Sequence, residues 1–341
     1  MFNNKSILIT GGSGLFGRCF IEIILRDYPN VRRIIVFSRD VQKHNEIQQL
    51  YPEKQFSQLR FFIGDVRDRE RLIRACEGVD IVIHAATIAS IEAAEYNPEE
   101  CVKTNIGGAE NVIDAALKTG VHDVIALSSD KACAPLNLYG ATQLVSDKLF
   151  VAANNMKGAK DIHFSVVRYG NVMGSKGSVI PLFLKRKELG GRSLPITDKR
   201  MTRFIISNQE VVTAVEFALE HHLGGEIFVP KTPSYRVTDL ATAIAPNMKH
   251  EEIGIRPGEK IYEELISRAE SGNTIEMDGY YAILPSLTYT GHRALDNYLE
   301  HYNAQTVADG FHYCSNENPV FETVESLREK IHLYIKPPIK F

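Results

Sequence analysis

Short apolar runs alternate with longer amphipathic segments along the first half of the chain. The apolar runs predict buried strands at 6–10, 34–37, 59–63, 81–84, 124–127 and 163–169. Between them, segments such as 98–119 repeat apolar residues on one helical face. Strands that alternate with helices at this spacing predict an α/β fold, namely a Rossmann-type doubly wound parallel sheet.

The pattern changes after Pro181, where elements become shorter and turns more frequent. We therefore expect a dinucleotide-binding Rossmann domain over 1–180, with returning segments from about 205–232. Residues 181–341 are expected to form mainly a smaller C-terminal α/β region that binds substrate. From about residue 267 onward the pattern indicates little.

Composition narrows the class of protein. A chain of 341 residues is long enough for one large α/β domain with a smaller one attached. A formal net charge of −3 gives no general attraction to nucleic acid or anionic membranes. The sequence has no uncharged apolar run near the length that spans a bilayer, and its start reads as a strand rather than a signal peptide. Five cysteines without a Cys-x-x-Cys pair, and histidines without ligand spacing, favour a cytoplasmic protein with reduced thiols and no metal.

A glycine-rich turn at 11–17 separates the first strand from a helical pattern. Glycines in such a turn let the backbone bend tightly and approach a pyrophosphate, while the helix N-terminus offers free N–H groups. The alternative is a glycine-rich turn without a ligand. The candidate cofactor residues here are Gly11, Gly14, Leu15, Phe16 and Gly17.

The second strand ends in Ser38, Arg39 and Asp40. An acidic residue at this point usually holds the ribose 2′-hydroxyl of NAD, whereas an arginine suits the 2′-phosphate of NADP. Because Ser38 and Arg39 come first, the order favours NADP. Alternatively, Asp40 caps the next helix and Arg39 is solvated; both can hold at once.

Two further positions bear on the cofactor. The small residues Ala85 and Ala86 follow the fourth strand and would let a dinucleotide pass close to the strand end. Asn105 is a polar residue near the buried side of the helix predicted over 98–119. It is either a satisfied core amide or a brace for the active site.

The densest group of reactive side chains follows the strand at 124–127. Ser129, Asp130 and Lys131 come at its carboxyl end, where open α/β sheets bind ligands. Tyr139 opens the next helix, and Gln143, one turn later, lies on the same face.

Two later segments carry candidate substrate residues. The glycine-rich stretch 168–178 contains Asn171 and Ser178 and is either shaped around a ligand or a plain turn. Arg203 and Arg256, the latter followed by Glu259, suit bidentate binding of a diphosphate. Ordinary surface arginines are an equal alternative.

These segments together resemble one branch of the extended short-chain dehydrogenases, the inverting UDP-N-acetylglucosamine 4,6-dehydratases that open pseudaminic acid and related bacterial surface-sugar pathways. The resemblance extends to about residue 285. Its most specific parts are Ser-Asp-Lys at 129–131 and Met-Thr-Arg-Phe at 201–204. The other matching stretches lie at 10–17, 38–40, 62–68, 94–98, 137–142, 168–172, 195–198, 224–231 and 254–260.

The resemblance implies a redox-neutral reaction of a UDP-sugar on bound NADP. By likeness, Tyr139 takes the 4-hydroxyl proton, Ser129 hydrogen-bonds the 4-oxygen, Lys131 removes the C5 proton and protonated Asp130 helps water leave C6. Hydride then returns to C6, and C5 is inverted. Asp65, followed by Val66, would lie beside the adenine. Relatives associate as homo-oligomers, a dimer or a hexamer, through helices like those at 98–119 and 138–156.

Two departures weaken the resemblance. Gln143 stands where the family has the lysine of Tyr-x-x-x-Lys, so the charge that favours a phenolate is missing. Ala89 and Ser90 replace a usual Lys-His pair, and Glu92 a common proline. We therefore expect reduced turnover, a shifted substrate or none. The alternatives are a UDP-sugar 4-epimerase or ketoreductase of the same superfamily, or a non-catalytic homologue that binds NADP or a UDP-sugar.

Overall fold

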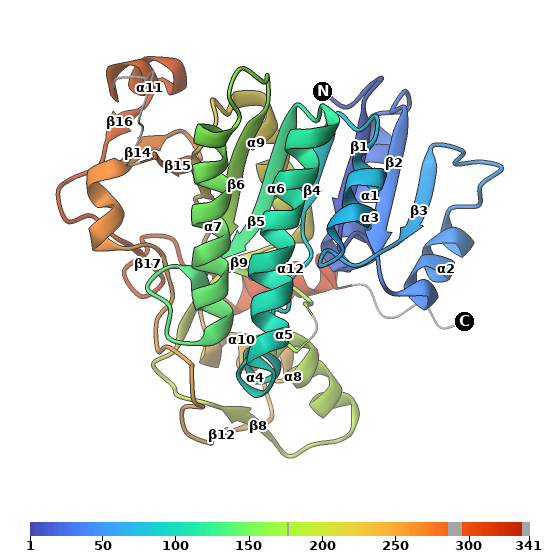
Figure 1. Ribbon diagram of the computed structural model, residues 1–341. Coiled ribbons are helices and arrows are strands. Elements are labelled where there is room, and N and C mark those ends of the chain that lie inside the picture. Colours follow the sequence, from blue (N-terminus) through green and yellow to red (C-terminus); the bar gives the residue numbers. More distant parts are fainter. Residues whose placement is uncertain (176, 286–294, 336–341) are drawn as a thin grey trace.

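The computed structural model describes residues 1–175, 177–285 and 295–335. Within them, one large sheet of ten strands has the order β16-β14-β15-β10-β6-β5-β4-β1-β2-β3 and carries helices on both faces (Figure 1). Neighbouring strands from β3 to β10 are parallel. The doubly wound α/β fold predicted from the sequence is therefore confirmed.

The parallel strands are mostly buried because both faces are covered, except that the edge strand β3 buries only Leu59. They are β1 (Ser6–Thr10), β2 (Arg33–Ser38), β3 (Leu59–Ile63), β4 (Ile81–His84), β5 (Asp123–Ser129), β6 (His163–Tyr169) and β10 (Ile227–Pro230). One face packs against α3 (Arg69–Cys76), α6 (Gly108–Thr119) and α7 (Leu138–Met156). The other packs against α1 (Leu15–Asp27) and α9 (Asn208–His221), while α2 (Val41–Leu50) contributes Ile47.

Beyond β10 the sheet continues with antiparallel strands from the last part of the chain. These are β15 (Tyr280–Ile283), β14 (Thr274–Met277) and β16 (Gln305–Thr306). The helix α11 (Leu295–Tyr302) packs Tyr298 and Tyr302 against the same face as α1. The sequence pattern had not indicated these additions.

A smaller α/β region lies at the end of the large sheet opposite the N-terminus (Figure 1). It contains two small sheets, β7 (Asn171–Val172) with β9 (Thr202–Ile206) and β11 (Ser234–Arg236), and β8 (Ser193–Ile196) with β12 (Lys249–Glu252). A further pair, β13 (Glu264–Ile266) with β17 (Tyr313–Cys314), packs against the core of the large sheet instead. The helices of the smaller region, α8 (Val179–Glu188), α10 (Val237–Ile244) and α12 (Val324–Tyr334), enclose a separate apolar core. The division into a cofactor domain and a substrate region stays a prediction.

The helix expected over 98–119 is confirmed, but its middle turn is wider than an α-helix. The segment consists of α5 (Pro98–Val102), a π-helical turn η1 (Lys103–Gly107) and then α6. Asn105 lies in this wider turn with its amide buried and bonded to other parts of the chain. Single π turns inside helices frequently occur at functional sites.

Candidate active site

The segment from β5 through the 3₁₀ turn η2 (Asp130–Ala132) into α7 builds the centre of the site. Asn137 caps α7 by accepting a hydrogen bond from the Gly140 N–H at 2.8 Å. Gly140 packs against the Lys131 carbonyl, where an added Cβ would lie 2.1 Å from the oxygen. The helix start is thereby held against η2, which brings Tyr139 toward Ser129, Asp130 and Lys131.

Asp130 and Lys131 form a buried ion pair. The Lys131 Nζ lies 2.9 Å from Asp130 Oδ1, which also accepts a 2.9 Å hydrogen bond from the Ser129 hydroxyl. Asp130 Oδ2 is buried and has no hydrogen-bond partner among the described residues. Burial raises the pKa of Asp130, and Lys131 opposes this rise. The pKa of Lys131 is also raised, because the attraction of nearby carboxylates exceeds the cost of burial.

Tyr139 is buried beside this pair. Burial raises the pKa of its phenol to about 12, although the Ser129 hydrogen bond and the Lys131 charge both lower it. At neutral pH the phenol is therefore protonated in the absence of ligands.

Gln143 is 4% exposed and lies one turn after Tyr139 on α7. Its amide nitrogen donates to the Leu127 carbonyl at 3.5 Å, and its oxygen accepts from the Thr87 hydroxyl at 3.2 Å. The position where the resemblance leads us to expect a lysine thus holds a neutral, hydrogen-bonded amide.

Asn105 links three parts of the site. It accepts from the Ile88 N–H at 2.8 Å and donates to the Ile88 carbonyl and to the Thr142 hydroxyl. Both readings of Asn105 from the sequence fit this arrangement, because the amide is satisfied and also joins the loop after β4 to α7.

A groove of about 340 Å³ runs over the carboxyl ends of β1, β2, β3 and β4. Its lining includes residues predicted for a dinucleotide: Gly11, Gly14, Ser38, Arg39, Asp65, Val66, Ala85 and Ala86. A Cβ at Gly11 would lie 2.9 Å from backbone atoms of Ala85 and Ala86, and one at Gly17 would lie 2.1 Å from the Gly12 carbonyl. These turns therefore require glycine, and the closely packed backbone suits a dinucleotide. Leu15 and Phe16 form the first turn of α1 beside the groove.

The end of β2 bears on the choice of cofactor. The Asp40 carboxylate caps α2 by accepting from the Lys43 N–H at 3.0 Å, and it also pairs with the Lys43 ammonium at 2.7 Å. The guanidinium of Arg39 is largely exposed and lies 3.3 Å from Asp65. Asp40 is thus engaged by the protein, and two cations, Arg39 and Lys43, line this end of the groove.

Of the candidate substrate residues, Asn171 and Arg203 lie in the cluster around Lys131, whereas Arg256, Glu259 and Ser178 form no hydrogen bond or ion pair with Lys131 among the described residues. Asn171 accepts a 2.9 Å hydrogen bond from Lys131. The guanidinium of Arg203 is nearly buried and donates to the carbonyls of Thr202, Lys260 and Ile261.

Arg256 and Glu259 pair with each other at 2.5 Å near the loop after β4. Ser178 precedes α8, and its buried hydroxyl has no hydrogen-bond partner among the described residues.

The departures from the family pattern also have a local structural role. Ser90 caps α4 (Ile91–Tyr96) by accepting from the Ala93 N–H at 3.2 Å. Glu92, in the first turn of α4, lies 3.5 Å from Arg256. This pair connects the loop after β4 to the segment that carries Arg256.

Sequence reasoning missed Glu263, which lies beside Lys131. Its Oε1 is 3.3 Å from the Lys131 Nζ and 3.7 Å from the Arg203 Nε, and its side chain is 5% exposed. It lies three residues beyond Lys260, the last residue of the matching stretch 254–260. A buried carboxylate there gives no signal in the local sequence pattern.

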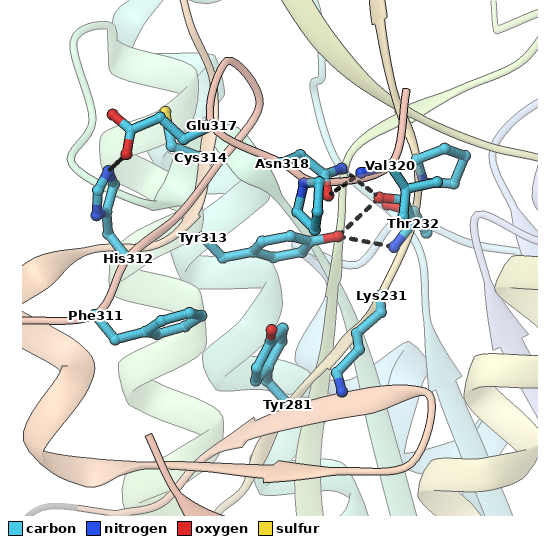
Figure 2. Close-up of a pocket in the computed structure, with 12 residues that line it drawn as sticks. Lys231, Thr232, Tyr281, Phe311, His312, Tyr313, Cys314, Glu317, Asn318 and Val320 are labelled. Carbon is cyan, nitrogen blue, oxygen red and sulfur yellow. Dashed lines mark hydrogen bonds and ion pairs between the residues drawn. The ribbon is translucent and has the colours of Figure 1, made fainter. Parts of the chain in front are cut away.

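The segment after residue 310 supports this part of the site. Residues of this segment line a hollow of about 220 Å³ together with Lys231, Thr232 and Tyr281. Figure 2 shows these side chains around the hollow. The Tyr313 hydroxyl donates to the Thr232 carbonyl at 2.7 Å and accepts from its N–H at 2.9 Å. Tyr313 thereby fastens the segment to the end of β10. None of the residues predicted for the site lines this hollow.

The fold and the Ser129–Tyr139 arrangement define a class of protein. The model of the polysaccharide biosynthesis protein family matches residues 7–285. The chain therefore belongs to this family, within the short-chain dehydrogenase/reductase superfamily.

Curated relatives include a UDP-N-acetylglucosamine 4,6-dehydratase (inverting) from Campylobacter jejuni subsp. jejuni serotype O:2, which is 52% identical over 97% of this chain and 98% of its own. The resemblance inferred from the motifs is confirmed. A UDP-glucose 4-epimerase from Rickettsia typhi is 39% identical over 83% of this chain and 84% of its own.

Solved structures agree with the fold. The X-ray structure of Pen from Bacillus thuringiensis has a TM-score of 0.86 and 35% identity and covers 98% of both chains. DesIV, a dTDP-glucose 4,6-dehydratase from Streptomyces venezuelae with NAD and TYD bound, has a TM-score of 0.67 and 22% identity over 75% of this chain and 86% of its own. At that identity the likeness concerns the fold alone.

The described part of the chain contains no cluster of His, Cys, Asp and Glu side chains arranged to hold a metal ion. Nor does it contain a helix long and apolar enough to cross a membrane.

Proposed function

We propose that this protein is an NADP-dependent 4,6-dehydratase of UDP-N-acetylglucosamine that inverts C5, in a bacterial surface-sugar pathway of the pseudaminic acid type. The observation that carries the proposal is the buried Asp130–Lys131 pair, placed beside Ser129 and Tyr139. An epimerase or a ketoreductase has no water to eliminate, so it has no use for a second acid–base pair next to the tyrosine.

At C4, Tyr139 is the base that takes the hydroxyl proton, and Ser129 hydrogen-bonds the 4-oxygen. NADP, when bound, accepts hydride from C4 and supplies it to C6. Because the pKa of Tyr139 is about 12 and Gln143 carries no charge, only a small share of the phenol is ionised at neutral pH. We therefore expect slow turnover.

Elimination follows because the 4-ketone acidifies the C5 proton. A proton that crosses the 2.9 Å from Lys131 Nζ to Asp130 Oδ1 leaves an amine and a carboxylic acid. The Lys131 amine then removes the C5 proton, and Asp130 protonates the departing 6-hydroxyl. One proton transfer thus prepares both groups, and the elimination restores the ion pair.

The cofactor is proposed to be NADP rather than NAD. Asp40 is occupied as the cap of α2, while Arg39 and Lys43 offer positive charge to a 2′-phosphate. Asn171, Ser178, Arg256 and Glu259 stay our candidates for contacts to the UDP-sugar.

Association into a homo-oligomer, a dimer or a hexamer, is also proposed. Val102 on α5 and Val145 on α7 are 41% and 40% exposed, on the helices through which relatives are expected to associate.

The test is incubation of the purified protein with UDP-N-acetylglucosamine and either NADP or NAD, followed by mass spectrometry and NMR. We expect loss of one water from the sugar, faster with NADP, and no loss with Lys131→Met. Lys199→Met, which removes an exposed lysine elsewhere, is the matched control and should keep the rate. A C4 epimer as product would favour the epimerase, and bound but unchanged substrate would favour the non-catalytic homologue.

A further inference from the structure

Four side chains of alternating charge run through the buried part of the site. Arg203 faces Glu263, Glu263 faces Lys131, and Lys131 faces Asp130, with separations of 3.7, 3.3 and 2.9 Å. Each of these side chains is between 1% and 17% exposed. Buried charges at such spacing interact far more strongly than charges at the surface.

The Lys131 ammonium has three acceptors, one for each of its hydrogens. They are Asp130 Oδ1, Asn171 Oδ1 and Glu263 Oε1. Asp130 is therefore one of two carboxylates that share this ammonium. The remaining oxygens, Asp130 Oδ2 and Glu263 Oε2, are buried and have no partner among the described residues.

Glu263 is itself held in place from two sides. Its backbone N–H donates to the Ser315 hydroxyl at 2.9 Å, and its carbonyl accepts from the Ser315 N–H at 2.8 Å. On the other side, Arg203 is fixed to three main-chain carbonyls, so its Nε presents a positive charge to the Glu263 carboxylate. This carboxylate cannot swing away from Lys131 without leaving its own counter-ion.

We propose that Glu263 is a positioning residue of the Asp130–Lys131 pair: its carboxylate, anchored by Arg203, holds the Lys131 ammonium beside Asp130 and sets the pH range in which the pair works. Arg203 acts through Glu263 rather than as a ligand of the diphosphate. The use of the proton in an elimination rests on the function proposed above, whereas the arrangement of charges does not.

The direction of the effect follows from the charges around Asp130. Lys131 lies on η2, Arg203 on β9, Tyr139 on α7 and Tyr235 on β11. Glu263 lies just before β13, and Lys260, three residues earlier, adds a further positive charge beside it. Glu263 is the anion in this group, and it raises the pKa values of both Asp130 and Lys131. Neutralising the Glu263 carboxylate should therefore lower the pKa values of both Asp130 and Lys131. The pH profile of the elimination should then move to lower pH.

The experiment is a titration of the whole protein labelled with ¹³C at the aspartate carboxyls, with the Asp130 resonance assigned from Asp130→Asn. In Glu263→Gln we expect the Asp130 midpoint to fall by about 1–3 pH units. Glu263→Asp keeps the negative charge, so its Asp130 midpoint should lie close to that of the native protein. Glu264→Gln removes the neighbouring carboxylate and is the matched control, with an unchanged midpoint.

The same variants are then assayed for water loss from UDP-N-acetylglucosamine. Glu263→Gln should move the falling limb of the kcat profile, where the pair loses its proton, to lower pH with little change in KM, and leave the rising limb of Tyr139 in place. An unmoved Asp130 midpoint in Glu263→Gln would overturn the inference whether or not the protein turns over. A shifted midpoint in a protein without turnover would uphold the inference and reject the proposed function instead.

Discussion

Tyr139 and Gln143 determine how fast the proposed reaction starts. The Tyr139 phenol has a pKa of about 12 because it is buried, and Gln143 satisfies its own hydrogen bonds with Thr87 and Leu127. Below this pKa, the ionised share of the phenol rises about tenfold with each pH unit. The rate of the native protein should accordingly increase with pH through the neutral range.

We predict that Gln143→Lys raises kcat at pH 7 by about tenfold or more and moves the rising limb of the pH profile to lower pH. The physical reason is that an ammonium near a phenol favours the phenolate and typically lowers its pKa by about 1–3 units. The measurement is the pH dependence of water loss from UDP-N-acetylglucosamine.

Gln143→Met is the matched control, since it keeps the length of the side chain without adding charge. It should give no gain. A Gln143→Lys profile that coincides with that of the native protein would show that Tyr139 is not the group whose ionisation limits the rate.

At the scale of secondary-structure elements, Arg168 joins three of them. It is the second-last residue of β6 and has no exposed surface. Its guanidinium lies 3.1 Å from Asp147 on α7 and 2.9 Å from Glu270 on the 3₁₀ helix η3 (Arg268–Asn273). It also donates to the Leu265 carbonyl on β13. The backbone that carries Glu263 is thereby tied to the strand next to β5.

Arg168→Leu should lower the free energy of unfolding by about 3–5 kcal/mol, because it leaves two buried carboxylates without their counter-ion. Urea denaturation at pH 7 measures the change. Arg26→Gln, at an exposed ion pair with Asp27, is the control and should leave the midpoint nearly unchanged. Equal midpoints for the two variants would mean that Asp147 and Glu270 find other partners.

The elements that could be predicted from sequence are those whose structure is determined by residues close to them in the chain. The apolar strands, the glycine turn at 11–17 and the segment from Ser129 to Tyr139 each depend on neighbouring residues, and the structure has them where expected. The π turn was not predictable from its local pattern, and its Asn105 bonds to Thr142, which is distant in the chain on another helix. Glu263 and Ser315 were missed for the same reason, since their partners are distant along the chain.

On the scale of the whole molecule, the site combines residues from both parts of the chain. Ser129, Asp130, Lys131 and Tyr139 come from the segment that runs from β5 through η2 into α7, while Glu263 comes from the later part of the chain, just before β13. The cofactor groove lies over the strand ends of the large sheet. This arrangement suits a reaction in which the sugar is oxidised, dehydrated and reduced without leaving one pocket.

The most direct test of this account is the fate of deuterium placed at C4 of UDP-N-acetylglucosamine. We predict that the product, short of one water, carries the deuterium at C6 of the same sugar, and that C5 carries hydrogen from the solvent. Deuterium returned to C4, with inversion there and no water lost, would contradict the account and identify a 4-epimerase.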